Sequence, residues 1–363
     1  MRRKKIGILT GGGDCPGLNA VIRAVVKASL FQHDYEVIGI LDGYTGLVEN
    51  RTLPLTEAMV SEILPKGGTI LGTSNTADPF RYAENDAAGK MTIRDRSRDA
   101  LAVIKTLELE GLLIVGGDGT QSIALKLSQL GVPIVGIPKT IDNDLDCTDV
   151  TFGFDSALAI ATEAVDRLHT TGESHKRAMV LEVMGRYTGW IALRSGMSGG
   201  ADVILIPELP YDIQKIRGSI QARIARGKRF SLIVVAEGAK PLGGEVVIQQ
   251  TIPGSPDPIR LGGIGHVVAH QVQQCTGIES RVTVLGHLQR GGIPTTFDRW
   301  LATRFGVHAV SLFASGHFGR MVTLRGQRIE SANLEDAVRR PRCVDPASEE
   351  VRAARAVGTC FGN

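Results

Sequence analysis

Short apolar runs recur along the chain, and many of them end at a glycine, an acidic residue or a proline. The runs are mostly apolar along their length instead of alternating with polar positions, which is typical of parallel strands covered on both faces. We expect strands at residues 5–10, 36–41, 112–115, 134–137, 178–183, 203–206, 232–236 and 282–285.

Helical spacing appears between several of these runs. Leu18, Val21, Ile22 and Val25 follow at intervals of three and four, which gives one apolar face, and Pro16 suits the first turn of this helix. Crossover helices are expected at residues 99–107, 121–130, 156–168 and 213–225. Alternating strands and helices favour a doubly wound α/β fold.

Two stretches fall outside this alternation. Residues 76–98 are polar and are expected to form a surface excursion. Residues 331–363 form a charged tail with a helix-like stretch at 348–356.

The composition narrows the class of protein. The formal net charge is +3 with Lys and Arg spread along 363 residues, which argues against a general nucleic-acid surface. No apolar run approaches the roughly 18 residues of a membrane span. The five cysteines are widely spaced and lack a CxxC pair, which argues against a disulfide framework or a zinc site. We expect a cytoplasmic protein.

The first candidate site is a glycine cluster at residues 10–14, after the first expected strand. Glycines before a helix N-terminus favour anion binding, although a tight turn would show the same pattern. Pro16 breaks a GxGxxG motif, and the sequence contains no GxxxxGK[ST] phosphate loop.

Two further loops follow neighbouring expected strands, and their sequences are GGDGT (116–120) and PKTIDND (138–144). The glycines of the first loop leave room for a polyphosphate, and Asp118 can hold Mg²⁺. Asp142 and Asp144 would point to the same side of an extended segment, where one can serve a metal and the other a substrate hydroxyl. An Asx-turn before a helix is the simpler alternative.

Charged residues also border the expected strands of the second half. Arg177 precedes one strand and residues 184–186 (MGR) follow it, whereas Glu237 closes another. Arg281 precedes the last strand and residues 286–292 (GHLQRGG) follow it. A single exposed arginine is usually solvated, but several at strand ends suggest a phosphate pocket.

Taken in order, these segments resemble the 6-phosphofructokinase family. The resemblance rests on LTGGGDCPGLNAVIR, DGYTGL, GGT, IVGGDGT, PKTIDND, FGFDSA, EVMGRYTGW, AEG and RVTVLGHLQRGG. It implies two doubly wound parallel-sheet domains with helices on both faces and an active site in the cleft between them. The phosphoryl-donor domain would comprise residues 1–153 plus about 289–340. The sugar-phosphate domain would comprise 154–288 plus the tail at about 341–363.

The same resemblance implies a role for each site residue. Asp142 would be the general base for the C1 hydroxyl of fructose 6-phosphate, with Thr140, Asp144, Lys139 and Arg186 assisting. Donor binding would fall to Gly12, Tyr44, Gly117, Asp118, Gly119 and Thr120, with Asp118 also holding Mg²⁺. The sugar phosphate would be bound by Thr140, Asp142, Arg177, Met184, Gly185, Arg186, Glu237, Arg281, His287 and Arg290.

The resemblance implies transfer of phosphoryl from Mg-ATP to fructose 6-phosphate in glycolysis, giving fructose 1,6-bisphosphate and ADP. Bacterial ATP-using members have glycine where Lys139 stands and arginine where Asn75 stands. Pyrophosphate-using members share the lysine but place an acid where Gly119 stands. Gly119 favours ATP over pyrophosphate, and Lys139 would supply the charge that Asn75 cannot.

The resemblance also implies a homotetramer, or at least a dimer, in which Arg177 and Arg281 serve the neighbouring subunit's site. Allosteric effectors would bind near Arg23, Lys27, Asp202, Lys228 and Arg229. GGDGT also occurs in NAD kinases and lipid kinases, whereas TIDND, MGR and GHLQRGG favour phosphofructokinase. A non-catalytic regulatory subunit would be expected to lack Asp142 or Asp118, and both are present.

Overall fold

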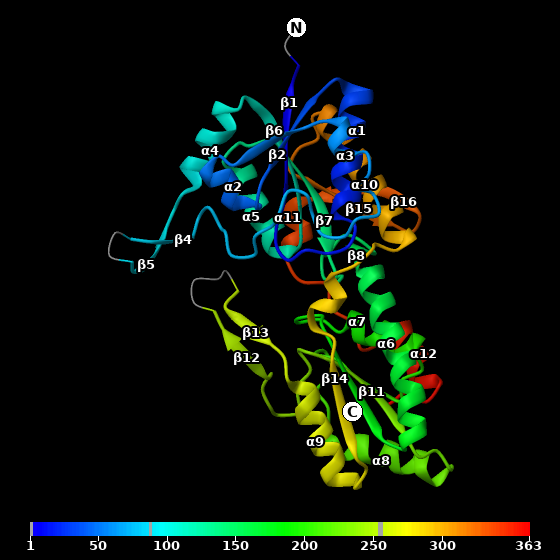
Figure 1. The fold of residues 1–363 in the computed structure, drawn as a ribbon. Coiled ribbons are helices and arrows are strands. Elements are labelled where there is room, and N and C mark those ends of the chain that lie inside the picture. Colours follow the sequence, from blue (N-terminus) through cyan, green and yellow to red (C-terminus); the bar gives the residue numbers. More distant parts are fainter. Residues whose placement is uncertain (1–2, 87–88, 253–256) are drawn as a thin grey trace. The chain divides into compact units, whose positions relative to one another are not determined.

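The computed structural model describes residues 3–86, 89–252 and 257–363. The chain forms two compact units (Figure 1). Unit 1 consists of Met1–Ser156, Ile252–Pro258 and Arg290–Pro341. Unit 2 consists of Ala157–Thr251, Ile259–Gln289 and Arg342–Asn363.

Unit 1 is built on a mainly parallel sheet with the strand order β16-β15-β7-β6-β1-β2-β3, and β8 pairs with β7. The strands are β1 (Lys5–Thr10), β2 (Glu36–Ile40), β3 (Thr52–Leu55), β6 (Leu109–Gly116), β7 (Ile134–Thr140), β8 (Phe152–Gly153), β15 (Arg320–Arg325) and β16 (Arg328–Asn333). The central strands pair in parallel, whereas β3 and β16 are antiparallel edges. The parallel α/β fold expected from the apolar runs is therefore confirmed.

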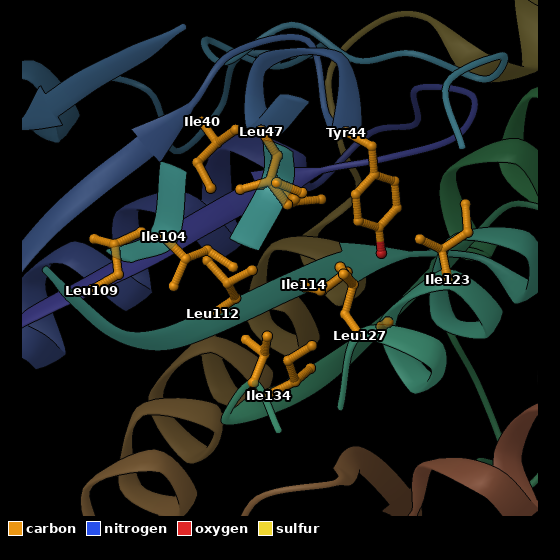
Figure 2. Packing of buried hydrophobic residues seen from close by; sticks show 14 of the residues in the cluster. Ile40, Tyr44, Leu47, Ile104, Leu109, Leu112, Ile114, Ile123, Leu127 and Ile134 are labelled. Carbon is orange, nitrogen blue, oxygen red and sulfur yellow. The ribbon is translucent and has the colours of Figure 1, made fainter. Parts of the chain in front are cut away.

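Helices cover both faces of this sheet, as Figure 1 shows. One face carries α1 (Leu18–His33) and α10 (Thr296–Ala314), with the short α3 (Glu57–Val60) beside α1. The other face carries α2 (Tyr44–Glu49), α4 (Ser97–Thr106), α5 (Asp118–Gln129) and α11 (Leu334–Val338). Strand residues such as Leu112, Ile114 and Ile134 pack with α4 and α5 in one buried cluster (Figure 2).

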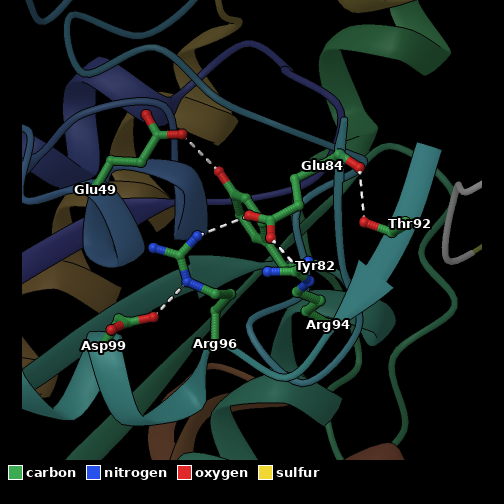
Figure 3. A network of polar contacts seen from close by, with 7 residues as sticks. All are labelled: Glu49, Tyr82, Glu84, Thr92, Arg94, Arg96 and Asp99. Carbon is green, nitrogen blue, oxygen red and sulfur yellow. Dashed lines mark hydrogen bonds and ion pairs between the residues drawn. The ribbon is translucent and has the colours of Figure 1, made fainter. Parts of the chain in front are cut away.

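The segment expected as a surface excursion instead contains a strand pair. β4 (Tyr82–Asn85) and β5 (Met91–Arg94) are antiparallel. The hydroxyl of Tyr82 donates to Glu49 over 2.7 Å, and Arg96 pairs with both Glu84 and Asp99 (Figure 3). Polar side chains that pair with one another therefore hold this hairpin, which is why its composition predicts a loop.

Unit 2 contains a second, fully parallel sheet in the order β10-β11-β9-β14. Its strands are β9 (Ala178–Val183), β10 (Val203–Leu205), β11 (Ser231–Ala236) and β14 (Ser280–Val284). Alternate residues face opposite layers: Val203 packs with α8 (Ile213–Ala225) and α9 (Ile264–Thr276), whereas Ile204 lies against α7 (Trp190–Ser198). β12 (Ile248–Thr251) and β13 (Ile259–Leu261) form a separate antiparallel pair.

The charged tail divides between the units. β16 and α11 belong to unit 1, whereas α12 (Glu349–Ala356) and its flanks belong to unit 2. Within unit 2, the Trp190 indole donates to the carbonyl of Arg342 over 2.8 Å. The backbone of Cys360 forms an isolated parallel β-bridge with that of Val203. The helix expected at 348–356 is present, and residues 342–363 of the tail are a packed part of unit 2.

In the part of the chain that is described, no helix is long and apolar enough to cross a bilayer.

The start of α6 (Phe154–His175) is capped by a carboxyl group from α10. Asp298 is buried, and its carboxylate accepts from the backbone N–H of Ser156 over 2.8 Å and from its hydroxyl over 2.6 Å. Burial raises the pKa of Asp298 from 3.8 to about 6, although the Ser156 hydrogen bonds oppose this. The cap therefore keeps its proton at a pH where an unfolded aspartate has lost it.

We expect Asp298→Asn to remove a pH dependence of stability. Between about pH 4 and 6 the native carboxyl binds a proton that the unfolded one has released, so the free energy of unfolding falls by up to about 3 kcal/mol as pH rises. Denaturant titrations from pH 4 to 7 should show a shallower slope in Asp298→Asn. Asp166→Asn, an exposed change on α6, should keep the wild-type slope. Equal slopes in all three proteins would contradict this account.

Candidate active site

The strand order of unit 1 marks where a ligand crevice is expected. β1 lies between β2 and β6, and the chain moves to β2 on one side and later to β6 and β7 on the other. In open α/β sheets, ligands bind outside the carboxyl ends of strands where this direction reverses. The glycine loops after β1 and β6 both lie at that edge.

The loop after β1 uses its first two backbone N–H groups within the protein. Gly11 donates to the Val115 carbonyl and Gly12 to the Ser74 carbonyl, each over 2.9 Å. The helix that follows begins only at Leu18, after the N-cap Gly17, so the placement of Pro16 in its first turn was wrong. Gly12 has a φ of 77°, which glycine adopts readily.

Lys139, at the end of β7, binds two backbone carbonyls of this loop. Its side chain is buried, and its ammonium donates to the Gly11 carbonyl over 2.9 Å and to the Gly13 carbonyl. Burial lowers the pKa of Lys139, and the guanidinium of Arg290 adds to this effect. An ammonium has three N–H donors, so one remains beyond these two bonds.

The loop after β6 opens directly into α5. Gly117 is the N-cap, Asp118 is the first helical residue, and both Asp118 and Gly119 are exposed. The first N–H groups of a helix lack intrahelical partners and carry the positive end of the helix dipole. A Cβ added at Gly119 would meet nothing within 4 Å, so this position borders open space.

The other glycines here serve packing around Thr120. A Cβ on Gly116 would lie 2.3 Å from the Thr120 Cβ, and one on Gly11 would lie 2.7 Å from its Cγ2. The Thr120 carbonyl accepts from the buried hydroxyl of Tyr44 over 2.8 Å. Gly116 is therefore explained by Thr120 and not by room for a polyphosphate. Tyr44, expected near the nucleotide, supports the loop from the core.

The residues at this helix start fit a magnesium ion that is shared with phosphate. Mg²⁺ usually takes one or two protein carboxylates and completes its octahedron with water and substrate phosphates. Asp118 offers one exposed carboxylate beside unfilled helix N–H groups. Among the described residues, no group of three or more His, Cys, Asp or Glu could hold a metal ion alone.

The loop after β7 buries two acids. Asp142 and Asp144 are each 7% exposed, and the Asp142 N–H donates to the Thr140 hydroxyl over 3.0 Å. Thr151, which lies outside the sequence motifs of the site, donates its hydroxyl to the Thr140 carbonyl over 2.8 Å. Asn143, between the acids, has a φ of 54°, so the expectation of an extended segment here was wrong.

Arg290 belongs to unit 1, and its side chain packs against the first glycine loop (residues 10–14). Its guanidinium donates to the Asp14 carbonyl over 3.1 Å, and a Cβ on Gly13 would lie 2.6 Å from its Nη1. His287, one turn earlier in η1 (Gly286–Arg290), is exposed and belongs to unit 2. The chain therefore passes from one unit to the other within this turn.

In unit 2, a hydrogen bond and close backbone packing join the loops at the carboxyl ends of β9 and β11. The Arg186 N–H donates to the Glu237 carboxylate over 3.0 Å, and a Cβ on Gly238 would lie 2.1 Å from the Arg186 carbonyl. Gly185 and Arg186 both have positive φ, at 141° and 54°. A non-glycine residue in this conformation is costly and is often held at functional sites. Met184 starts this fixed loop.

Arg177 and Arg281 lie at the amino-terminal ends of strands in the same sheet, opposite to the carboxyl ends that carry Arg186 and Glu237. Arg177 precedes β9, Arg281 is near the start of the parallel strand β14, and both pair with Glu279. A six-residue strand spans about 20 Å, so one chain cannot place these arginines beside Arg186. Within one chain, these strand-end cations therefore do not all line one pocket.

Two of the five residues expected at an effector site form ion pairs within the chain. Lys27 pairs with Glu57 over 2.9 Å, and Asp202 pairs with Arg223 over 2.6 Å. Burial raises the pKa of Asp202. Regulation at these residues stays a prediction.

Comparisons with known proteins agree on one family. A family model described as phosphofructokinase matches residues 5–313. The ATP-dependent 6-phosphofructokinase 2 of Clostridium perfringens is 52% identical over 361 residues, 99% of both chains. A pyrophosphate–fructose 6-phosphate 1-phosphotransferase of Streptomyces coelicolor is 50% identical over 359 residues, 99% of this chain and 100% of its own. The phosphofructokinase structure from Saccharomyces cerevisiae is 31% identical with a TM-score of 0.77, covering 93% of this chain and 45% of that one.

Proposed function

Because this chain belongs to the phosphofructokinase family, we propose that it transfers phosphoryl from Mg-ATP to the C1 hydroxyl of fructose 6-phosphate. The products are fructose 1,6-bisphosphate and ADP, and the setting is cytoplasmic glycolysis. The observation that carries the proposal is the pair of neighbouring strand ends in unit 1. One presents exposed Asp118 and Gly119 at a helix start, and the other presents buried Asp142.

The donor phosphates bind at the start of α5. The N–H groups of its first turn, at Gly119 and Thr120, attract negative charge, and no side chain at Gly117 or Gly119 obstructs the approach. Bound Mg²⁺, held by Asp118, would neutralise charge on the phosphates. Gly12 contributes by its missing side chain, since its N–H is already bonded within the protein.

Asp142 accepts the proton of the C1 hydroxyl as that oxygen attacks the phosphorus. Thr140 positions Asp142, because its hydroxyl accepts from the Asp142 N–H. Lys139, and Arg186 from unit 2, balance the charge that develops on the transferred group. Phosphoryl transfer relies on such positioning and charge neutralisation more than on covalent chemistry.

The sugar phosphate binds to residues of unit 2 and to Arg290. Met184, Gly185 and Arg186 line the sugar, Glu237 accepts from its hydroxyls, and His287 with Arg290 holds the 6-phosphate. That these groups meet in a cleft between the units stays a prediction. Arg177 and Arg281, at the far edge of the sheet, are proposed to complete the site of a neighbouring subunit in a homotetramer or homodimer.

The choice of donor rests on Gly119. Relatives named for ATP and for pyrophosphate are equally similar to this chain, at 52% and 50% identity, so overall identity does not decide it. Gly119 leaves space where the pyrophosphate-using branch is expected to carry an acid, and this favours a nucleotide. The alternative is a pyrophosphate-dependent enzyme, for which Lys139 is equally suitable.

We expect fructose 6-phosphate to be phosphorylated much faster with Mg-ATP than with Mg-pyrophosphate. A coupled assay that follows fructose 1,6-bisphosphate, with each donor in turn, measures this directly. Faster turnover with pyrophosphate would favour the alternative donor, and no turnover with either would sink the proposal. Gly119→Asp should raise the KM for ATP about 10- to 100-fold through like-charge repulsion. Gly119→Ala adds a methyl group without charge and should raise the KM for ATP less than Gly119→Asp does.

We expect Asp142→Asn to lower kcat by about 10²–10⁴-fold, the range for one positioned base. Fructose 6-phosphate affinity, measured by calorimetry, should change little because the amide keeps the size of the side chain. Asp146→Asn is the matched control, since Asp146 pairs with Arg340 on the surface and should not affect kcat. A near-normal kcat in Asp142→Asn would overturn the assignment of the base.

We expect Lys139→Met to lower kcat by about 100-fold, the cost typical of losing one charged or hydrogen-bonding group that faces the transition state. ATP binding, measured separately with a non-hydrolysable analogue, should weaken less. Lys126→Ala, on the outer side of α5, is the control and should leave kcat unchanged. Loss of ATP affinity with an unchanged kcat would contradict the role given to Lys139.

A further inference from the structure

Gln121 links the two strand ends that carry the acids. It lies in the first turn of α5, three residues after Asp118, and it is fully buried. Its amide nitrogen donates to the carbonyls of Ile114 and Gly116 on β6 over 3.0 and 3.2 Å, and to Ile137 on β7 over 3.1 Å.

This amide acts where the backbone ladder between the strands stops. β6 and β7 pair in register from Leu112 with Ile134 to Gly116 with Pro138. Proline has no N–H, so it cannot donate a further ladder bond. Beyond this pair the strands lead to Asp118 and Asp142. Gln121 therefore adds a side-chain connection between the two strands beside the last pair of the ladder, just before the two acid-bearing loops.

Gly136 leaves the space that this side chain needs. A Cβ at Gly136 would lie 2.4 Å from the Gln121 Oε1, which is too close for the methyl group and the amide to coexist. Among the described residues the Oε1 atom has no hydrogen-bond partner. An orphaned buried acceptor is costly, and such groups in native proteins call for an explanation.

We propose that Gln121 is a positioning residue that sets the separation of Asp118 and Asp142. The proposal rests on the proposed function, since it assumes that these two acids serve one phosphoryl transfer. Near-attack geometry requires reacting atoms about 3–3.5 Å apart, and a misplacement of about 1 Å can cost about 100-fold in rate. Gln121 itself touches no substrate.

Three variants test this: Gln121→Ala, Gly136→Ala and the double variant. Gln121→Ala should lower kcat about 10- to 100-fold, with each KM within about threefold because the binding groups are intact. Gly136→Ala should have the same signature, since its methyl group displaces the amide. In the double variant the methyl group occupies the vacated space, so the second change should add no further loss. Gln129→Ala, at the exposed end of α5, should match wild type.

Two results from these variants would overturn the proposal. One is a lowered Tm in Gln121→Ala with unchanged kcat, which is the signature of a packing role alone. The other is additive loss in the double variant, which would mean that the two residues act separately. If Gln121→Ala does not fold, the kcat and KM of Gly136→Ala decide the question alone.

Failure of the proposed function would appear differently, as a wild-type protein that does not turn over fructose 6-phosphate. Amide hydrogen exchange of the unliganded protein still tests the link in that case. Gln121→Ala should speed exchange at residues 116–120 and 138–142 and leave unit 2 unchanged. Unaltered exchange in both segments would refute the link.

Discussion

The pairing of β6 with β7 is the constraint on which the proposed site depends. Parallel neighbours place their carboxyl ends on the same side of the sheet, so the loops that follow β6 and β7 become adjacent. The two ends then differ in environment. Asp118 is exposed at a helix start, where a metal and phosphate can approach, whereas Asp142 is buried in a loop held by Thr151. One carboxylate is suited to a cation and the other to a proton.

Around this pair, unit 1 connects its three strand-end loops to one another. Lys139 on β7 donates to backbone carbonyls of the loop after β1, and the Gly11 N–H donates to the Val115 carbonyl near the end of β6. Thr120 of α5 fills the space left by Gly11 and Gly116. Each loop is therefore positioned by residues of another loop. The glycines are needed for different reasons. Gly116 leaves space for Thr120 and Gly136 leaves space for Gln121, whereas Gly119 borders open space.

Much of this could be predicted from the sequence. Continuous apolar runs identify the eight expected strands, because a strand covered on both faces is apolar along most of its length. The acid- and glycine-rich loops follow where those runs end. Side-chain contacts over long sequence distances could not be predicted. The bonds of Lys139, the packing of Thr120 and the split of the arginines between two sheet edges depend on strand order, which periodicity does not encode. The β4–β5 hairpin was missed because its polar side chains resemble those of a loop.

The most direct measurement is a crystal structure of the protein with fructose 6-phosphate, Mg²⁺ and a non-hydrolysable ATP analogue. The account predicts that the Asp142 carboxylate lies within hydrogen-bonding distance of the C1 oxygen, about 2.6–3.2 Å. It also predicts that the Asp118 carboxylate coordinates the Mg²⁺, directly or through water. A complex in which either carboxylate points away from the reacting groups, with both ligands bound, would contradict it.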